Sequence, residues 1–169
     1  MITATIPYNF VKNRTDLGWR EIRFGLDHQL IAPKVAIERA VDILVAEKSP
    51  SRDEVELASL SENESVRDLV FRLAEGVPPR SDDELKDKWL YLVLAWVFQI
   101  RESIADPLVL LEEIYSDFEY PAEMASFVRY MPMQGPDLRN QEQNEARLFD
   151  NWKDYLNNAR ERFAPKRNG

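Results

Sequence analysis

Helix start signals recur along this chain and constrain its fold more than any other feature. Ser51, Ser61 and Ser81 each precede a glutamate by three residues, the spacing of a capping box, in which a hydroxyl and a carboxylate satisfy free backbone N–H groups at a helix start. Asp106-Pro107 combines an N-cap residue with proline at the first helical position. These signals predict a chain built mainly from helices that short connections join.

Between these signals, apolar residues recur at helical spacing. The amphipathic stripes run over Trp19–Leu26, Val35–Val45, Val66–Leu73, Leu108–Phe118 and Leu148–Phe163. From Leu85 to Ile104 the apolar residues occupy every face, so we expect other helices to surround this segment at the centre of the fold. Only residues 2–11, rich in Thr, Ile, Phe and Val, have a composition that would suit a strand.

We therefore predict an all-α fold: a compact bundle of about seven or eight helices in a single domain, residues 1–169. Helical-hairpin repeats are an alternative arrangement of the same helices. We expect residues 1–13 to form an irregular N-terminal segment and residues 133–141 to form a short linker. The C-terminal helix then spans residues 138–163.

The composition of the chain limits the cell compartments and the kinds of chemistry that we expect for it. The chain has no cysteine, which excludes disulfides, thiolate nucleophiles and cysteine metal sites. Its longest apolar run is about half of the roughly 20 residues that a membrane span needs, so we expect no membrane association. The first residues lack both the basic start and the apolar stretch of a secretory signal. A cytoplasmic location is therefore expected.

Negative charge is concentrated in the middle of the chain. Residues 53–123 hold 18 acidic and 6 basic side chains, a net charge of −12, whereas the whole chain carries −8. Because contacts to phosphate need Lys and Arg, we expect no nucleic-acid binding there. An acidic surface favours a cationic protein partner by electrostatic steering. The alternative interpretation is that these acidic residues only keep the helix surfaces soluble.

The sequence carries no recognisable catalytic set. The single histidine, His28, follows Asp27, and adjacent helical residues point about 100° apart, so Asp27 is poorly placed to orient it. A histidine near a helix end is also an ordinary C-terminal cap. The five glycines are scattered singly and form no phosphate-binding loop. We therefore predict a protein that is not an enzyme, with no cofactor and no bound metal.

Clustered carboxylates leave one enzymatic alternative open. Glu113 and Asp117 lie four residues apart on one helical face, and Glu119 follows. Such carboxylates can hold a hard cation or act in general acid–base chemistry. A carboxylate-dependent hydrolase or metal-binding enzyme is therefore the alternative function, although solvated acidic faces are the usual result of helix amphipathicity.

The segment from Ile114 to Pro132 is the densest in aromatic, proline and ionisable residues. Tyr120-Pro121 predicts the end of one helix, and Pro121 suits the first position of the next, which we expect to continue to Pro132. The aromatic residues either close the core around this corner or form a recognition surface, because interface hot spots favour aromatics and arginine. The candidate partner-binding surface consists of Tyr115, Asp117, Glu119, Tyr120, Arg129 and Tyr130.

Several of these motifs together resemble an uncharacterised family of small bacterial helical proteins. The resemblance rests on Trp19, on Trp89-Leu90-Tyr91-Leu92 leading to Trp96, on Tyr115-Ser116-Asp117-Phe118-Glu119-Tyr120-Pro121, and on Tyr130-Met131-Pro132. It covers roughly residues 15–132. Small helical families of this type are often immunity partners of secreted bacterial toxins. The resemblance thus implies a non-enzymatic protein-binding domain, an immunity protein whose partner is a basic toxin domain.

Overall fold

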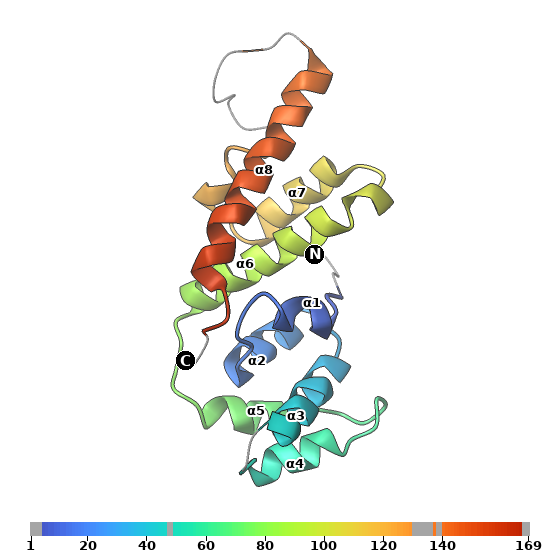
Figure 1. Ribbon diagram of the computed structural model, residues 1–169, viewed down its shortest axis with the longest axis vertical. Coiled ribbons are helices and arrows are strands. Elements are labelled where there is room, and N and C mark those ends of the chain that lie inside the picture. Colours follow the sequence, from blue (N-terminus) through green and yellow to red (C-terminus); the bar gives the residue numbers. More distant parts are fainter. Residues whose placement is uncertain (1–4, 47–48, 130–136, 138–139, 167–169) are drawn as a thin grey trace. The chain divides into compact units, whose positions relative to one another are not determined.

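The computed structural model describes residues 5–46, 49–129, 137 and 140–166, which contain eight α-helices, two short 3₁₀ helices and no β-strand (Figure 1). The all-α prediction is confirmed, and the number of α-helices agrees with it. The elements are α1 (Tyr8–Lys12), α2 (Trp19–Asp27), α3 (Lys34–Ala46), α4 (Arg52–Ala58), α5 (Arg67–Glu75), α6 (Asp82–Gln99), η1 (Arg101–Ser103), α7 (Pro107–Asp117), η2 (Ala122–Met124) and α8 (Gln141–Phe163).

The chain divides into two compact units, and the boundary falls between Trp89 and Leu90, inside α6. The N-terminal unit comprises residues 3–89 and 165–169, and the C-terminal unit comprises residues 1–2 and 90–164. The expected single domain over residues 1–169 stays a prediction. Among the described residues, no helix combines the length and the apolar character that crossing a membrane requires.

The core of the N-terminal unit surrounds Trp89. Helix α3 packs against α4 and α1, while α5 packs against α2 and α4. The indole of Trp89 is fully buried, and its Nε1 donates to the backbone oxygen of Glu21 at 3.0 Å. Gly25, on the next turn of α2, lets this indole approach the helix backbone. The sequence-based expectation that the tryptophan-rich helix is deeply buried is therefore confirmed here.

The expectation of an irregular segment at residues 1–13 is wrong where α1 forms. Pro7 is the N-cap of this five-residue helix, and its carbonyl accepts from the backbone N–H groups of Phe10 and Val11. Tyr8, Phe10 and Val11 are buried, so tertiary burial stabilises a helix that is too short to persist alone. Residues 5–11 form no strand either, and residues 1–4 lie outside the described part.

The predicted capping boxes at helix starts do not all form completely. Ser51 forms the complete capping box of α4, since Ser51 Oγ accepts from the Glu54 N–H at 3.2 Å and Glu54 Oε1 accepts from the Ser51 N–H at 2.9 Å. At Ser61 only the glutamate half forms, with Glu64 Oε2 accepting from the Ser61 N–H at 2.8 Å. The residues that follow Ser61 form a turn. Helix α5 begins only at Arg67, directly after its buried N-cap residue, Val66.

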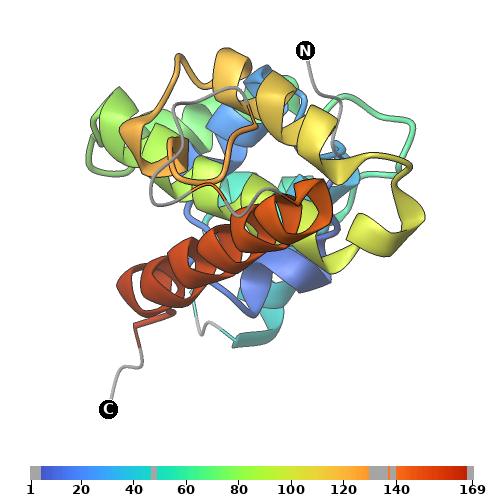
Figure 2. The same ribbon diagram turned by 90° about the horizontal axis from the view of Figure 1, so that it is seen from above.

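An aromatic core holds the C-terminal unit together, with α8 lying against α6 in both views (Figures 1 and 2). The fully buried Trp152 of α8 meets Phe98 of α6 edge-on, with ring centroids 4.9 Å apart. Tyr91 and Phe163 stack at 5.5 Å. The predicted C-terminal helix is confirmed from Gln141 onward, with Asn140 as its N-cap. Most of the predicted linker at residues 133–141 lies outside the described residues.

Candidate functional site

The predicted corner begins with an unusual end of α7. After the C-cap residue Phe118, Glu119 and Tyr120 both adopt left-handed backbone angles, with φ of 62° and 61°. The Glu119 N–H donates to Ser116 O at 3.1 Å, and the Tyr120 N–H donates to Tyr115 O at 2.7 Å. This pair of bonds is the Schellman motif, in which glycine usually occupies the position of Glu119. The motif fixes the backbone that carries Tyr120.

The same corner presents an aromatic side chain to solvent. The rings of Tyr115 and Tyr120 meet edge-on, with centroids 5.2 Å apart. An apolar contact between these two positions commonly accompanies a Schellman motif. Tyr120 is nevertheless 64% exposed, the most exposed aromatic side chain among the large hydrophobic residues of the described chain. Tyr115 and Tyr120, two of the residues predicted for the partner-binding surface, are therefore in contact, and the side chain of Tyr120 is exposed to solvent.

The second helix expected in this corner is wrong for the residues described. After Pro121 the chain forms only η2, followed by turns up to Arg129. Met124 and Phe127 are fully buried, so the segment dips into the core of the C-terminal unit. Tyr130, the last residue of the predicted surface, lies outside the described residues.

Arg129 links the corner to the start of α7 and to α8. Its guanidinium bonds both carboxylate oxygens of Asp106, the N-cap of α7, at 3.1 Å each, and reaches Glu145 Oε1 of α8 at 3.2 Å. This hydrogen bonding lowers the pKa of Asp106 and raises the pKa of Arg129. Such a bidentate pair is typical of arginine and carboxylate. Among the residues of the predicted surface, Arg129 therefore has a structural task.

The carboxylates of the enzymatic alternative do not form a metal site. Among the described residues, no group of three or more His, Asp or Glu side chains is arranged to hold a metal ion. Glu113, Asp117 and Glu119 are exposed. His28 serves as the C-cap residue of α2, with its ring 4.1 Å from that of Phe24, as the sequence suggested for a histidine at a helix end.

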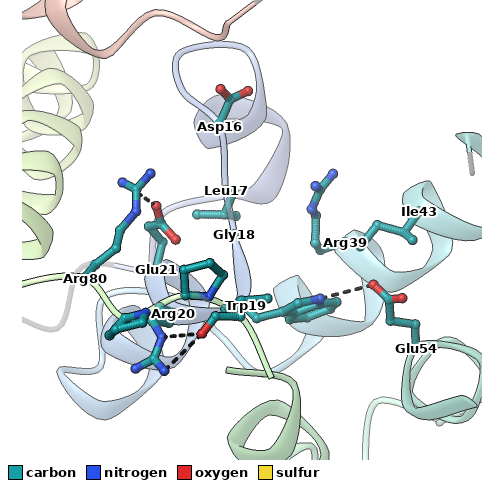
Figure 3. Close-up of a pocket in the computed structure, with 13 residues that line it drawn as sticks. Asp16, Leu17, Gly18, Trp19, Arg20, Glu21, Arg39, Ile43, Glu54 and Arg80 are labelled. Atoms are coloured by element: carbon teal, nitrogen blue, oxygen red, sulfur yellow. Dashed lines mark hydrogen bonds and ion pairs between the residues drawn. The ribbon is translucent and has the colours of Figure 1, made fainter. Parts of the chain in front are cut away.

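The N-terminal unit contains a cavity that the sequence did not reveal (Figure 3). Its volume is about 460 Å³. The start of α2, one face of α3, the first turn of α4 and the α5–α6 connection form its walls. The lining residues are Asp16, Leu17, Gly18, Trp19, Arg20, Glu21, Arg39, Ile43, Glu54, Val77, Pro78, Pro79 and Arg80.

A buried carboxylate forms one side of this cavity. Glu21 is 4% exposed, and its Oε1 accepts from Lys88 Nζ at 2.9 Å and from Arg80 at 3.1 Å. Lys88 also donates to the Asp16 carbonyl at 3.2 Å. A Cβ atom at Gly18 would lie 2.7 Å from Glu21 Oε2, so glycine at the N-cap of α2 makes room for the carboxylate. Two cations thus compensate one buried negative charge, as a buried ion needs.

Hydrogen bonds between elements hold the other walls. Trp19 Nε1 donates to Glu54 Oε2 at 3.1 Å, while the other oxygen of Glu54 caps α4. Arg20 donates from Nε and Nη2 to the Val77 carbonyl at 3.3 and 3.2 Å. Figure 3 shows the indole of Trp19 reaching toward Glu54, with Arg39 and Arg80 on opposite sides of the cavity. The wall residues come from segments up to 64 positions apart, so no local sequence pattern marks them.

The fold and these two sites define an all-α protein with an exposed tyrosine at a rigid helix end and a charged cavity at a helix start. Over residues 8–160 the sequence matches the model of a family described as an uncharacterised protein conserved in bacteria (DUF2247), and the chain belongs to that family. The resemblance to an uncharacterised bacterial family is confirmed, and the match extends it into α8. The comparisons found no matching curated protein and no matching solved structure.

Proposed function

We propose that this chain is a non-enzymatic protein-binding domain whose partner contacts the corner at the end of α7. The observation that carries the proposal is the exposed ring of Tyr120, held by the Schellman motif and by Tyr115. Tyrosine is enriched among the residues that dominate interface energetics. Because the backbone and the neighbouring ring already restrict Tyr120, little conformational entropy remains to be lost on binding.

The charge around this corner indicates the chemistry of the partner. Residues 112–123 contain five acidic side chains and no Lys or Arg. Opposite charges across an interface accelerate encounter and suppress wrong partners. A basic protein therefore fits this surface best. A basic toxin domain has this chemistry, and in that case the chain acts as its immunity protein.

The test measures binding of the full chain to the product of the neighbouring gene, by calorimetry at low and at raised ionic strength. We expect a stoichiometric complex that weakens as salt is added, because screening removes the electrostatic attraction. Tyr120→Ala should weaken binding by roughly 30-fold or more, the size of a hot-spot loss.

The matched control is Val109→Ala, since Val109 is also an exposed apolar residue of α7, 42% accessible, but lies in the first turn, away from the corner. This variant should bind like the wild type. Equal affinity of the Tyr120→Ala variant and the wild type would contradict the proposed surface. Absence of any complex at low ionic strength would contradict the proposed function.

A further inference from the structure

We propose that the cavity of the N-terminal unit is a binding site for a small organic monoacid, whose carboxylate is held by Arg39 and whose apolar body lies against Leu17 and Ile43. This site lies in the other compact unit from the Tyr120 corner, so the proposal is independent of the protein-binding function.

The size and the walls of the cavity suit such a ligand. Its volume of about 460 Å³ falls within the roughly 300–1,000 Å³ of typical small-molecule sites. Its walls include Leu17, Ile43 and the Val77-Pro78-Pro79 segment, which offer apolar surface. Ligand sites commonly combine walls of this kind with a few charged groups that fix orientation.

The charges around the cavity leave an excess of one cation. Each lining carboxylate has a donor from the protein: Glu21 from Lys88 and Arg80, Glu54 from Trp19 and the Ser51 N–H, and Asp16 from the Lys166 N–H. The lining arginines are Arg20, Arg39 and Arg80. With Lys88, which lies behind Glu21, four positive charges face three negative ones. Asp42, which acts on Arg39 from outside the lining, is itself paired with Lys12 at 3.5 Å. One further carboxylate would therefore balance the remaining positive charge.

Arg39 is the arginine best placed to receive that carboxylate. Arg20 is committed to the Val77 carbonyl, and Arg80 already pairs with Glu21. Arg39 interacts with the Tyr8 hydroxyl, which itself donates to Asp42. A guanidinium has five N–H donors and can grip a carboxylate with two of them.

The apolar part of the ligand has a place beside this arginine. Arg39 and Ile43 stand four residues apart on α3, so they share one face of that helix, and both line the cavity. Figure 3 shows both of them on the same side of the cavity, with Leu17 between Arg39 and Arg80. A ligand with an acid group and an adjacent hydrocarbon body matches this order of charged and apolar surface.

The experiment titrates the ¹⁵N-labelled full chain with phenylacetate and, separately, with phenylacetamide, which keeps the shape and loses the charge. The Trp19 indole N–H reports on the cavity directly. We expect phenylacetate to bind with a Kd on the order of 1 mM, as a fragment of this size should, and the amide to bind at least tenfold more weakly. Equal affinities, or shifts that fall outside the cavity lining, would overturn the proposal without any variant.

Two variants then locate the charge recognition. Arg39→Gln should abolish the preference for the acid, whereas Arg67→Gln, an exposed arginine of α5 outside the cavity lining, should retain it. Dispersed amide signals establish that each variant is folded. A folded Arg39→Gln variant that still prefers the acid tenfold would show that Arg39 is not the carboxylate ligand, and would refute the proposed site.

Discussion

Replacing Gly25 by alanine tests the packing of the N-terminal core most directly. A Cβ atom at this position would lie 2.6 Å from Cζ2 and 2.8 Å from Cη2 of Trp89, and 3.0 Å from Cδ1 of Ile31. Carbon atoms pack comfortably only at about 3.5–4.0 Å. The indole has no room to retreat, because Trp89 is fully buried and its Nε1 is bonded to the Glu21 carbonyl at 3.0 Å.

The magnitude follows from two opposing terms. Overpacking a close-packed core costs about 1–3 kcal/mol, and the rigid ring places this site at the upper end, about 3 kcal/mol. Alanine in a helix is about 1 kcal/mol more favourable than glycine. The Gly25→Ala variant should therefore lose about 2 kcal/mol in free energy of unfolding.

Urea unfolding followed by circular dichroism measures this loss. The matched control is Gly76→Ala, whose Cβ would meet the Leu73 and Arg72 carbonyls at 3.5 and 3.6 Å, ordinary contact distances. At φ −79° alanine is unstrained, so this variant should gain about 0.4–1 kcal/mol. In the Gly25→Ala/Trp89→Phe double variant the two losses should not add, because the clashing ring atoms are gone. If Gly25→Ala matched the wild type in stability, the packing argument would be refuted.

Two further predictions concern the C-terminal unit. Glu119→Gly should raise the free energy of unfolding by about 1 kcal/mol, because glycine adopts the left-handed conformation without strain, whereas Glu113→Gly inside α7 should lower it by about the same amount; urea unfolding of both variants decides. The pKa of Asp106, ordinarily 3.8, is lowered by its bond to Arg129, so the ionised carboxylate stabilises the folded state above pH 3.8, and this stabilisation is lost as the pH falls through the lowered pKa. The stability difference between wild type and Asp106→Ala should accordingly shrink in unfolding measurements below pH 3.8, and a difference that stays constant with pH would contradict it.

Local signals made much of the helical framework predictable. Ser51 and Asp106 act as caps through side-chain bonds within three residues of sequence, so their spacing alone is informative. Helix α1 escaped prediction because its five residues depend on burial of Tyr8, Phe10 and Val11, which is a tertiary effect. The expected helix after Pro121 failed for the same reason, since burial of Phe127 outweighs the local preference.

The two candidate sites differ in how far they could be predicted from the sequence. The corner at Tyr120 is a continuous segment, so its aromatic density was visible, although the left-handed backbone of Glu119 and Tyr120 was not, because neither residue is a glycine. The cavity joins Arg39 on α3 to Glu54 on α4 and Arg80 before α6. Residues brought together by packing alone leave no periodic trace in one sequence.

A second Schellman motif in the chain shows what is particular about Tyr120. At the end of α2, Gln29 has φ 57°, its N–H donates to Leu26 O at 3.1 Å, and the Leu30 N–H donates to Gly25 O at 2.8 Å. Leu30 occupies the position that Tyr120 occupies after α7, yet Leu30 is buried. An apolar side chain at this position ordinarily packs against the preceding helix. At the end of α7, Tyr120 packs against Tyr115 but remains largely exposed.

The comparison yields opposite expectations for two truncations. Leu30→Ala should cost about 2–5 kcal/mol of stability, as removal of a buried leucine does. Tyr120→Ala removes an exposed ring whose contact with Tyr115 is worth about 1 kcal/mol, so it should leave the protein folded while weakening partner binding by the roughly 30-fold or more expected of a hot-spot residue. Thermal unfolding of both variants separates the two roles. A loss at Tyr120 as large as that at Leu30 would assign Tyr120 to the core and remove the basis for a recognition surface there.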